Sequence, residues 1–169
     1  ALSVSATTRE PRPGEMDGRE YFFVSREEFK KRIAEDALIE YACYCDNYYG
    51  TPREYAQKHL EEGRDVILEI EIQGALKIKE KYPDALLLFV MPPSAEELHR
   101  RLSGRGTETK EVIEKRLRRA AQEAKGIEEY DYIVINDDLD TFVKELHAII
   151  TAAHNTPVRN EEFIEKMRM

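Results

Sequence analysis

Six consecutive apolar residues at positions 86–91 (LLLFVM) restrict the fold more than any other feature of this 169-residue chain. The run is far shorter than the ~18 apolar residues that a membrane-spanning helix needs. A strand that is apolar on both faces is typical of a parallel sheet covered by helices on both sides. Residues 132–136 (YIVIN) repeat the pattern, and residues 65–75 (DVILEIEIQGA) predict a third strand, ended by Gly74.

Helical segments fall between and after these strands. Apolar residues recur at spacings of three and four from Leu139 to Ala153, which predicts an amphipathic helix. Three further helix starts carry a hydroxyl followed three residues later by a glutamate, at Ser25/Glu28, Thr51/Glu54 and Ser94/Glu97. In the second of these, Pro52 would occupy the first helical position. Strands that alternate with helices predict an α/β fold with a parallel sheet.

Charge and cysteine content exclude several classes of protein. The chain has 26 basic and 34 acidic residues, a net charge of −8, which argues against a generic nucleic-acid binder. Its two cysteines, Cys43 and Cys45, have no second pair, so neither a zinc site nor a disulfide framework is expected.

A stiff arginine-containing loop is the first candidate binding element. Arg9 and Arg12 lie among Pro11, Pro13 and Gly14, residues that fix where a loop turns. Guanidinium groups suit a dianionic phosphate because each can donate two parallel hydrogen bonds. Two solvated surface arginines are the alternative interpretation.

Seven motifs together resemble the guanylate kinase family, in the family's order and at similar spacings from residue 1 to about residue 150. They are SVSATTREPRPGE (3–15), DGREYFFVS (17–25), YYGTP (48–52), DVILEIEIQGA (65–75), PPS (92–94), RLSGRGTE (101–108) and INDDL (135–139). The resemblance implies transfer of the terminal phosphoryl group of ATP to GMP, giving ADP and GDP, with Mg²⁺ as cofactor. The protein is expected in the cytoplasm. No nucleic acid and no membrane are expected as partners.

The fold that the resemblance implies is the parallel-sheet nucleoside monophosphate kinase core of the P-loop NTPase type, with an inserted GMP-binding lobe and a helical lid. We accordingly expect core segments at 1–4, 63–99 and 124–154, the lobe at 5–62 and the lid at 100–123. Residues 155–169 are expected to form a peripheral helix or tail.

Carried over by position, the resemblance assigns the GMP phosphate to Arg9, Arg12, Tyr21 and Tyr49. It assigns guanine to Ser5, Glu40 and Thr51, and a carboxylate such as Glu40 can accept from the ring N–H and the exocyclic amine of guanine. Each assignment has a plainer alternative, since Glu40 could be a solvated strand residue and Thr51 a helix cap.

Two carboxylates follow on the predicted strand, where Glu69 and Glu71 would share one face. The family usually has Asp at the second position, and Glu71 is expected to reach guanine, or one of the two to reach Mg²⁺ through water. No other metal ligand is expected in this chain.

Three lid arginines are the expected catalytic residues, Arg101, Arg105 and Arg116. Arg101 and Arg105 are four apart and thus neighbours on a helix. Arg116 lies on an otherwise apolar stripe, so an anion is expected to meet it. The resemblance places the adenine of ATP near Asn136.

The family's phosphate-binding loop, G-x-x-x-x-G-K-[ST], does not occur in these 169 residues. We therefore expect the chain to be part of a longer one and, alone, to be inactive.

The alternative function is a decayed interaction module, which would be expected to lose several of the phosphate and lid arginines that this chain retains. A different nucleoside monophosphate kinase is opposed by Glu40 and YYGTP.

Overall fold

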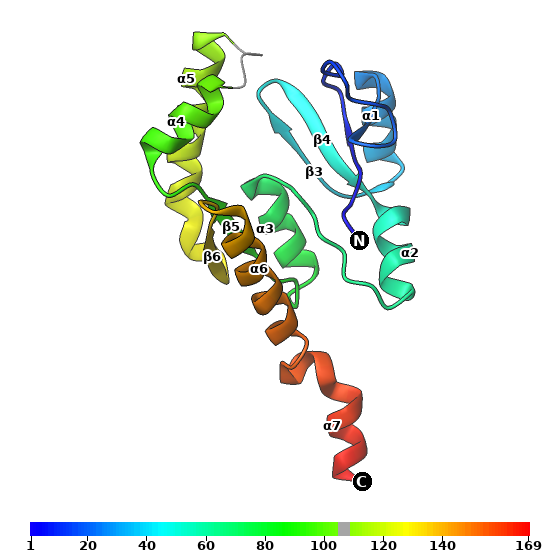
Figure 1. Cartoon of the computed structure of the whole chain (residues 1–169). Helices are drawn as coiled ribbons and strands as arrows, with labels where there is room; N and C mark the ends of the chain where they lie inside the picture. The colour runs from blue at the N-terminus through cyan, green and yellow to red at the C-terminus, as the bar shows by residue number, and fades with distance from the viewer. Residues whose placement is uncertain (105–108) are drawn as a thin grey trace. The chain divides into compact units, whose positions relative to one another are not determined.

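The fold is described from a computed structural model, over residues 1–104 and 109–169. The chain divides into two compact units, Ala1–Pro83 and Asp84–Met169. Each unit has a sheet of its own, of four strands in the first and two in the second. Figure 1 labels the α-helices and most of the strands of both.

The sheet of the first unit has the strand order β2-β1-β4-β3. Its strands are β1 (Ser5–Thr7), β2 (Tyr21–Phe23), β3 (Leu38–Tyr44) and β4 (Asn47–Pro52). β1 runs parallel to β2 and antiparallel to β4, while β3 and β4 form the hairpin drawn in cyan in Figure 1. The hairpin turns through Cys45 and Asp46, both at positive φ (48° and 66°), as a tight two-residue turn between right-twisted strands requires.

Three helices belong to the first unit, α1 (Arg26–Ala34), α2 (Arg53–Glu61) and α3 (Ile72–Lys81). Phe29 of α1 is fully buried against Ala6 and Leu38 of the sheet, and its ring stacks on that of Tyr48 with centroids 5.4 Å apart. This cluster is the core of the unit.

The predicted capping of α1 is confirmed, but that of α2 is wrong. Ser25 Oγ accepts from the N–H of Glu28 at 3.1 Å. In contrast, Thr51 belongs to β4, and Pro52 rather than Thr51 is the N-cap of α2, with no side-chain capping bond. The Thr51 hydroxyl instead donates to the buried carboxylate of Glu40 and therefore does not cap the N-terminus of α2.

The strand predicted over residues 65–75 is also wrong. Within the described residues, this segment pairs through one bridge, between Leu2 and Ile67, with hydrogen bonds from Ser3 N to Ile67 O (2.9 Å) and from Ile67 N to Ala1 O (2.8 Å). So short a ladder does not sustain a strand. Glu71 then caps α3 by accepting from Gly74 N at 3.0 Å, and Gly74 lies inside the helix. Glu69 and Glu71 therefore do not share a strand face.

The second unit confirms the predicted parallel pairing. β5 (Leu88–Met91) and β6 (Tyr132–Ile135) run parallel in register, each shorter than the segment predicted for it. The helices are α4 (Ala95–Gly104), α5 (Lys110–Glu123), α6 (Leu139–Ala153) and α7 (Glu161–Arg168), with 3-10 turns η1 (Ala124–Glu129) and η2 (Pro157–Asn160). The predicted cap at Ser94 is confirmed, since its Oγ accepts from Glu97 N at 3.1 Å.

Two lysines of α3 hold the outer edge of β3, which is an edge strand of its sheet. Lys77 Nζ donates to Tyr41 O at 2.8 Å, and Lys81 Nζ donates to Ile39 O at 3.2 Å. These carbonyls flank Glu40, and the lysines are four residues apart on one helix face. α3 therefore fixes the part of β3 that carries Glu40.

Close packing of the hairpin requires a glycine at position 50. A Cβ there would lie 2.9 Å from the carbonyl oxygen of Glu40 and 3.0 Å from Tyr41 Cβ. We predict that Gly50→Ala lowers the free energy of unfolding by about 1–3 kcal/mol, measured by urea denaturation, because the strands must separate to admit the methyl group.

The control for this prediction is Gly104→Ala, since a Cβ at position 104 would meet no atom of the described residues within 4 Å. An equal change in both variants would contradict the steric explanation.

Candidate functional site

A buried carboxylate with a hydroxyl donor forms the centre of the candidate site in the first unit. Glu40 is 3% exposed and Thr51 is fully buried. Thr51 Oγ1 donates to Glu40 Oε1 at 2.8 Å, across the register that pairs the two residues in β3 and β4. The alternative of a solvated strand residue at position 40 is therefore wrong. A buried carboxylate must find donors, and it retains further lone pairs for a ligand that offers N–H groups.

Burial raises the pKa of Glu40 above its ordinary value. Hydrogen bonds from the Thr51 side chain and backbone act in the opposite direction, as does the charge of Lys77, whereas the charge of Glu71 raises the pKa further. Burial is the largest of these effects, so the folded protein retains the Glu40 proton more strongly than the unfolded chain does.

Ser5 lies in the same part of the sheet as the Glu40–Thr51 pair. It is buried in β1 directly before Ala6, whose partner Gly50 directly precedes Thr51, so the continued antiparallel register would set Ser5 opposite Thr51. Directly opposite residues of an antiparallel pair share a face. The structure thus brings the three residues predicted for base recognition together on the adjacent strands β1, β4 and β3.

Arg9 is held by a carboxylate that the sequence analysis missed. Its two terminal nitrogens donate to the two oxygens of Glu15, each at 2.9 Å, and Nη1 also donates to Glu10 O at 2.7 Å. Glu15 Oε2 in addition accepts from the backbone N–H of Arg12 at 2.7 Å. The hydrogen bond to Glu15 raises the pKa of Arg9, and the same bond lowers the pKa of Glu15. Glu15 thereby connects both predicted phosphate-binding arginines.

Aromatic rings complete this region. The Arg9 guanidinium lies 5.3 Å from the ring centroid of Tyr21 and 5.7 Å from that of Phe23. Tyr21 and Tyr49 meet edge to face with centroids 6.0 Å apart. Burial raises the pKa of Tyr21, which keeps its phenol protonated as a hydrogen-bond donor. The structure therefore gathers Arg9, Tyr21 and Tyr49.

In the second unit, Arg101 lies next to the predicted adenine-binding residue. Arg101 Nη1 donates to the backbone oxygen of Asn136 at 2.7 Å. Asn136 directly follows β6, and its N–H continues the parallel ladder by donating to Met91 O at 2.8 Å. Loops at the carboxyl ends of parallel strands are where α/β folds bind their ligands.

Glu97 holds Arg101 in this position and is a second residue that the sequence analysis missed. Its carboxylate accepts from Arg101 Nε at 2.6 Å and from Arg100 at 2.6 and 2.7 Å. The hydrogen bonds from Arg100 and Arg101 lower the pKa of Glu97 to about 2. The sequence signal was present, because Glu97 lies three and four residues before these arginines, spacings that favour ion pairs on a helix.

The remaining predicted residues are not part of these contacts. Arg116 lies in α5 and is half-buried, as its place on an apolar stripe indicates. Arg105 lies outside the described residues. Glu69 is exposed, and Glu71 caps α3.

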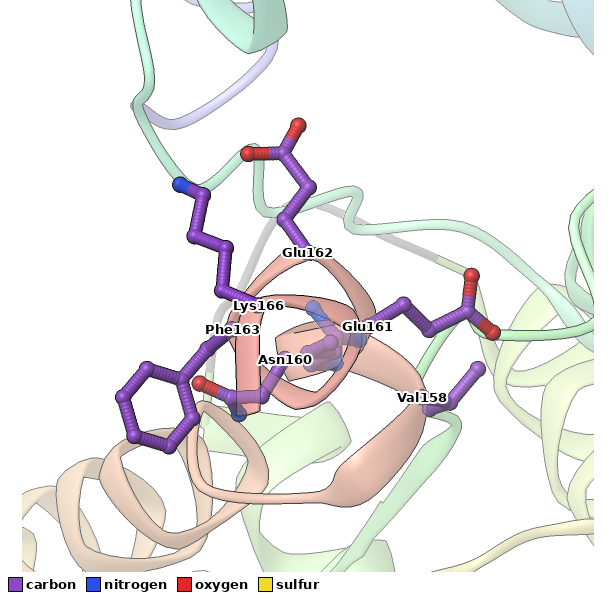
Figure 2. Close-up of a pocket in the computed structure, with 7 residues that line it drawn as sticks. Val158, Asn160, Glu161, Glu162, Phe163 and Lys166 are labelled. Atoms are coloured by element: carbon purple, nitrogen blue, oxygen red, sulfur yellow. The ribbon is translucent and has the colours of Figure 1, made fainter. Parts of the chain in front are cut away.

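A hollow of about 420 Å³ lies beside the start of α7, at a distance along the chain from every predicted site residue. Figure 2 shows Val158, Asn160, Glu161, Glu162, Phe163 and Lys166 around it. Its lining is an exposed helix turn with charges of both signs, so it offers a ligand little enclosure. Within residues 1–104 and 109–169, no group of three or more His, Cys, Asp or Glu side chains could hold a metal ion.

Comparisons with known proteins agree on one family. The sequence model of the guanylate kinase family matches residues 1–153. The chain is 53% identical over 167 residues to guanylate kinase of Caldanaerobacter subterraneus subsp. tengcongensis, covering 99% of this chain and 81% of the relative. It is 54% identical over 150 residues to that of Desulfitobacterium hafniense, covering 89% and 75%.

A solved structure is also similar. The crystal structure of guanylate kinase from Anaplasma phagocytophilum superimposes with a TM-score of 0.82 at 36% identity, over 94% of this chain and 78% of that one.

Removal of the Glu40 charge should change the dependence of stability on pH. Because its folded pKa is raised, the contribution of Glu40 to the free energy of unfolding is greatest below the ordinary value of 4.5 and is lost as pH rises through the folded value. We predict that Glu40→Gln, which can still accept from Thr51, is more stable than the wild type at neutral pH. This gain should vanish below about pH 4.5, as measured by urea denaturation across pH.

The control is Glu80→Gln, which removes one negative charge from an exposed position of α3. A gain for Glu40→Gln that is the same at pH 4 and pH 8 would contradict the prediction.

Proposed function

The chain belongs to the guanylate kinase family, and on this premise we propose which residues bind each substrate. The reaction is the transfer of the terminal phosphoryl group of ATP to GMP, which gives ADP and GDP. We propose that the lobe at residues 5–62 binds GMP, that residues 100–123 form the lid, and that residues 1–4, 63–99 and 124–154 are the core. The observation that carries the substrate assignment is the buried Glu40–Thr51 pair.

Glu40 is the proposed selector of guanine, with Thr51 and Ser5 beside it. An ionised carboxylate only accepts hydrogen bonds, and guanine presents the ring N–H and the exocyclic amine on one edge. Adenine has an acceptor and a C–H at the corresponding positions, so it would leave the buried carboxylate without donors. A site built in this way rejects the wrong base because its own polar group then lacks partners.

The phosphate of GMP is assigned to Arg9, with Arg12, Tyr21 and Tyr49 as additional donors. Within the described part of the chain, the bonds to Glu10 and Glu15 use three of the five N–H donors of Arg9. Two donors are therefore available to phosphate oxygens, while Glu15 keeps the planar group oriented.

On the ATP side, Arg101 and Arg116 are the proposed catalytic arginines, with Arg105 assigned by the family resemblance alone. Phosphoryl transfer requires alignment and positive charge around the moving group more than covalent participation by the protein. Glu97 and the backbone oxygen of Asn136 orient Arg101. Asn136 is the proposed neighbour of adenine.

Mg²⁺ is proposed to accompany the phosphates of ATP. The described residues do not themselves provide a cluster of metal ligands. The sequence predicts that Glu71 reaches guanine or a metal-bound water. In the structure, one of its carboxylate oxygens accepts from Gly74 N at the start of α3.

A cytoplasmic location is proposed because both substrates are nucleotides of that compartment. In the part of the chain that the structure covers, none of the helices is long and apolar enough to cross a membrane.

Glu40→Gln tests the base assignment. We predict a roughly ten- to hundredfold loss of GMP affinity, the equivalent of about 1.5–3 kcal/mol for a hydrogen bond to a charged group. AMP affinity should stay the same or rise, because an amide can donate to adenine. Calorimetric titration with both nucleotides measures this, and an equal loss for GMP and AMP would contradict the assignment.

Arg9→Ala tests the phosphate assignment. We predict a ten- to hundredfold loss of affinity for GMP, again from about 1.5–3 kcal/mol, and almost none for guanosine, which has no phosphate. The control is Arg64→Ala, an exposed arginine paired with Glu62 in the same unit. If GMP and guanosine weaken equally in Arg9→Ala, then Arg9 has only a structural role.

A further inference from the structure

The first turn of α3 meets the Glu40 carboxylate at a glycine. Gly74 is buried, and its N–H is donated to Glu71. A Cβ at position 74 would lie 2.5 Å from Glu40 Oε2 and 3.3 Å from Glu40 Cδ. Real Cβ atoms do not approach an oxygen so closely, so any side chain at this position would displace one of the two groups.

The Glu40 carboxylate cannot move aside without weakening the hydrogen bond that it accepts from the Thr51 hydroxyl. Its other oxygen, Oε1, accepts from the fully buried Thr51 hydroxyl at 2.8 Å. A rotation that takes Oε2 away from position 74 also turns Oε1 away from this hydroxyl, and an unsatisfied buried carboxylate is costly.

The backbone cannot easily move aside either. Lys77 and Lys81 of α3 donate to Tyr41 O and Ile39 O, the carbonyls on both sides of Glu40. The helix that carries Gly74 and the strand that carries Glu40 are thus joined at two points within one helical turn of each other.

We propose that Gly74 is a positioning residue for base selection. With no side chain at position 74, the α3 backbone forms a wall against Oε2, while Thr51 holds Oε1, and together they fix the plane of the carboxylate. The inference rests on the proposed role of Glu40 as the reader of guanine. Selectivity for guanine then also depends on Gly74, a residue that contributes no side chain to the site.

The test compares GMP with IMP, which keeps the ring N–H of guanine but lacks the exocyclic amine. A carboxylate in its native plane accepts from both groups of GMP, so GMP should bind better than IMP. In Gly74→Ala the added methyl group turns the Glu40 carboxylate out of its native plane. The carboxylate then keeps at most one of its two hydrogen bonds to the ring N–H and the exocyclic amine of GMP. We expect GMP affinity to fall about tenfold or more and IMP affinity to fall less, so that the GMP-to-IMP ratio decreases.

Glu80→Gln is the control, because it changes an exposed side chain of the same helix α3. It should leave both affinities unchanged. A folded Gly74→Ala protein that keeps the wild-type ratio overturns the inference, since a merely structural role would weaken both nucleotides alike.

Glu40→Gln separates this inference from the proposed function. If Glu40→Gln lowers the GMP-to-IMP ratio and Gly74→Ala does not, only the role of Gly74 fails. If Glu40→Gln leaves the ratio unchanged, Glu40 does not read guanine, and both proposals fail.

A second comparison applies if Gly74→Ala does not fold. In the Glu40→Ala background the carboxylate is gone, so adding Gly74→Ala should leave the thermal unfolding midpoint nearly unchanged. An equally large fall of the midpoint with and without Glu40 would show that position 74 conflicts with something else, and would overturn the inference.

Discussion

One buried negative charge sets the requirements that the rest of the first unit must meet. Glu40 lies in an edge strand with 3% of its surface exposed, where an ionised carboxylate is stable only if donors surround it. Thr51 supplies one donor, and Gly74 lets helix α3 approach without a side chain. Burial of this charge costs stability, but water would compete with the N–H donors of a purine base for a hydrated carboxylate. A buried carboxylate avoids this competition.

The two proposed substrate sites share one arrangement, in which a glutamate holds an arginine. Glu15 holds Arg9 by two parallel bonds, and Glu97 holds Arg101 at the start of the second unit's helices. In both cases the folded protein itself orients the arginine. Each pair lies within a single unit, so the orientation of either arginine depends only on the folding of its own unit.

Local sequence signals predicted local structure well and failed where a distant group intervened. The caps at Ser25 and Ser94, the parallel pair β5–β6 and helix α6 depend on neighbouring residues or on periodicity, and each was predicted. Thr51 carried the same capping signature but bonds to Glu40, eleven residues away. The alternating pattern of residues 65–75 resembled a strand, yet pairing requires an adjacent backbone, which no periodicity reveals. Glu15 was missed because a carboxylate in a charged loop has no pattern that distinguishes an oriented ion pair from a solvated one. Glu97 does have the helical ion-pair spacing to Arg100 and Arg101, but it also completes the capping signature with Ser94, and only that role was assigned to it.

The Arg9–Glu15 pair also has an entropic consequence for the proposed binding of the GMP phosphate. Arginine is among the side chains that lose most rotamer freedom when immobilised. Here that freedom is already restricted in the folded protein, by two bonds to Glu15 and by the rings of Tyr21 and Phe23. Ordering such a side chain at an interface costs about 0.5–1.5 kcal/mol, so rigidity present before binding strengthens phosphate binding by a factor of roughly two to ten. If Arg9 binds the phosphate as proposed, a carboxylate that would repel the nucleotide on charge alone thus contributes to its affinity.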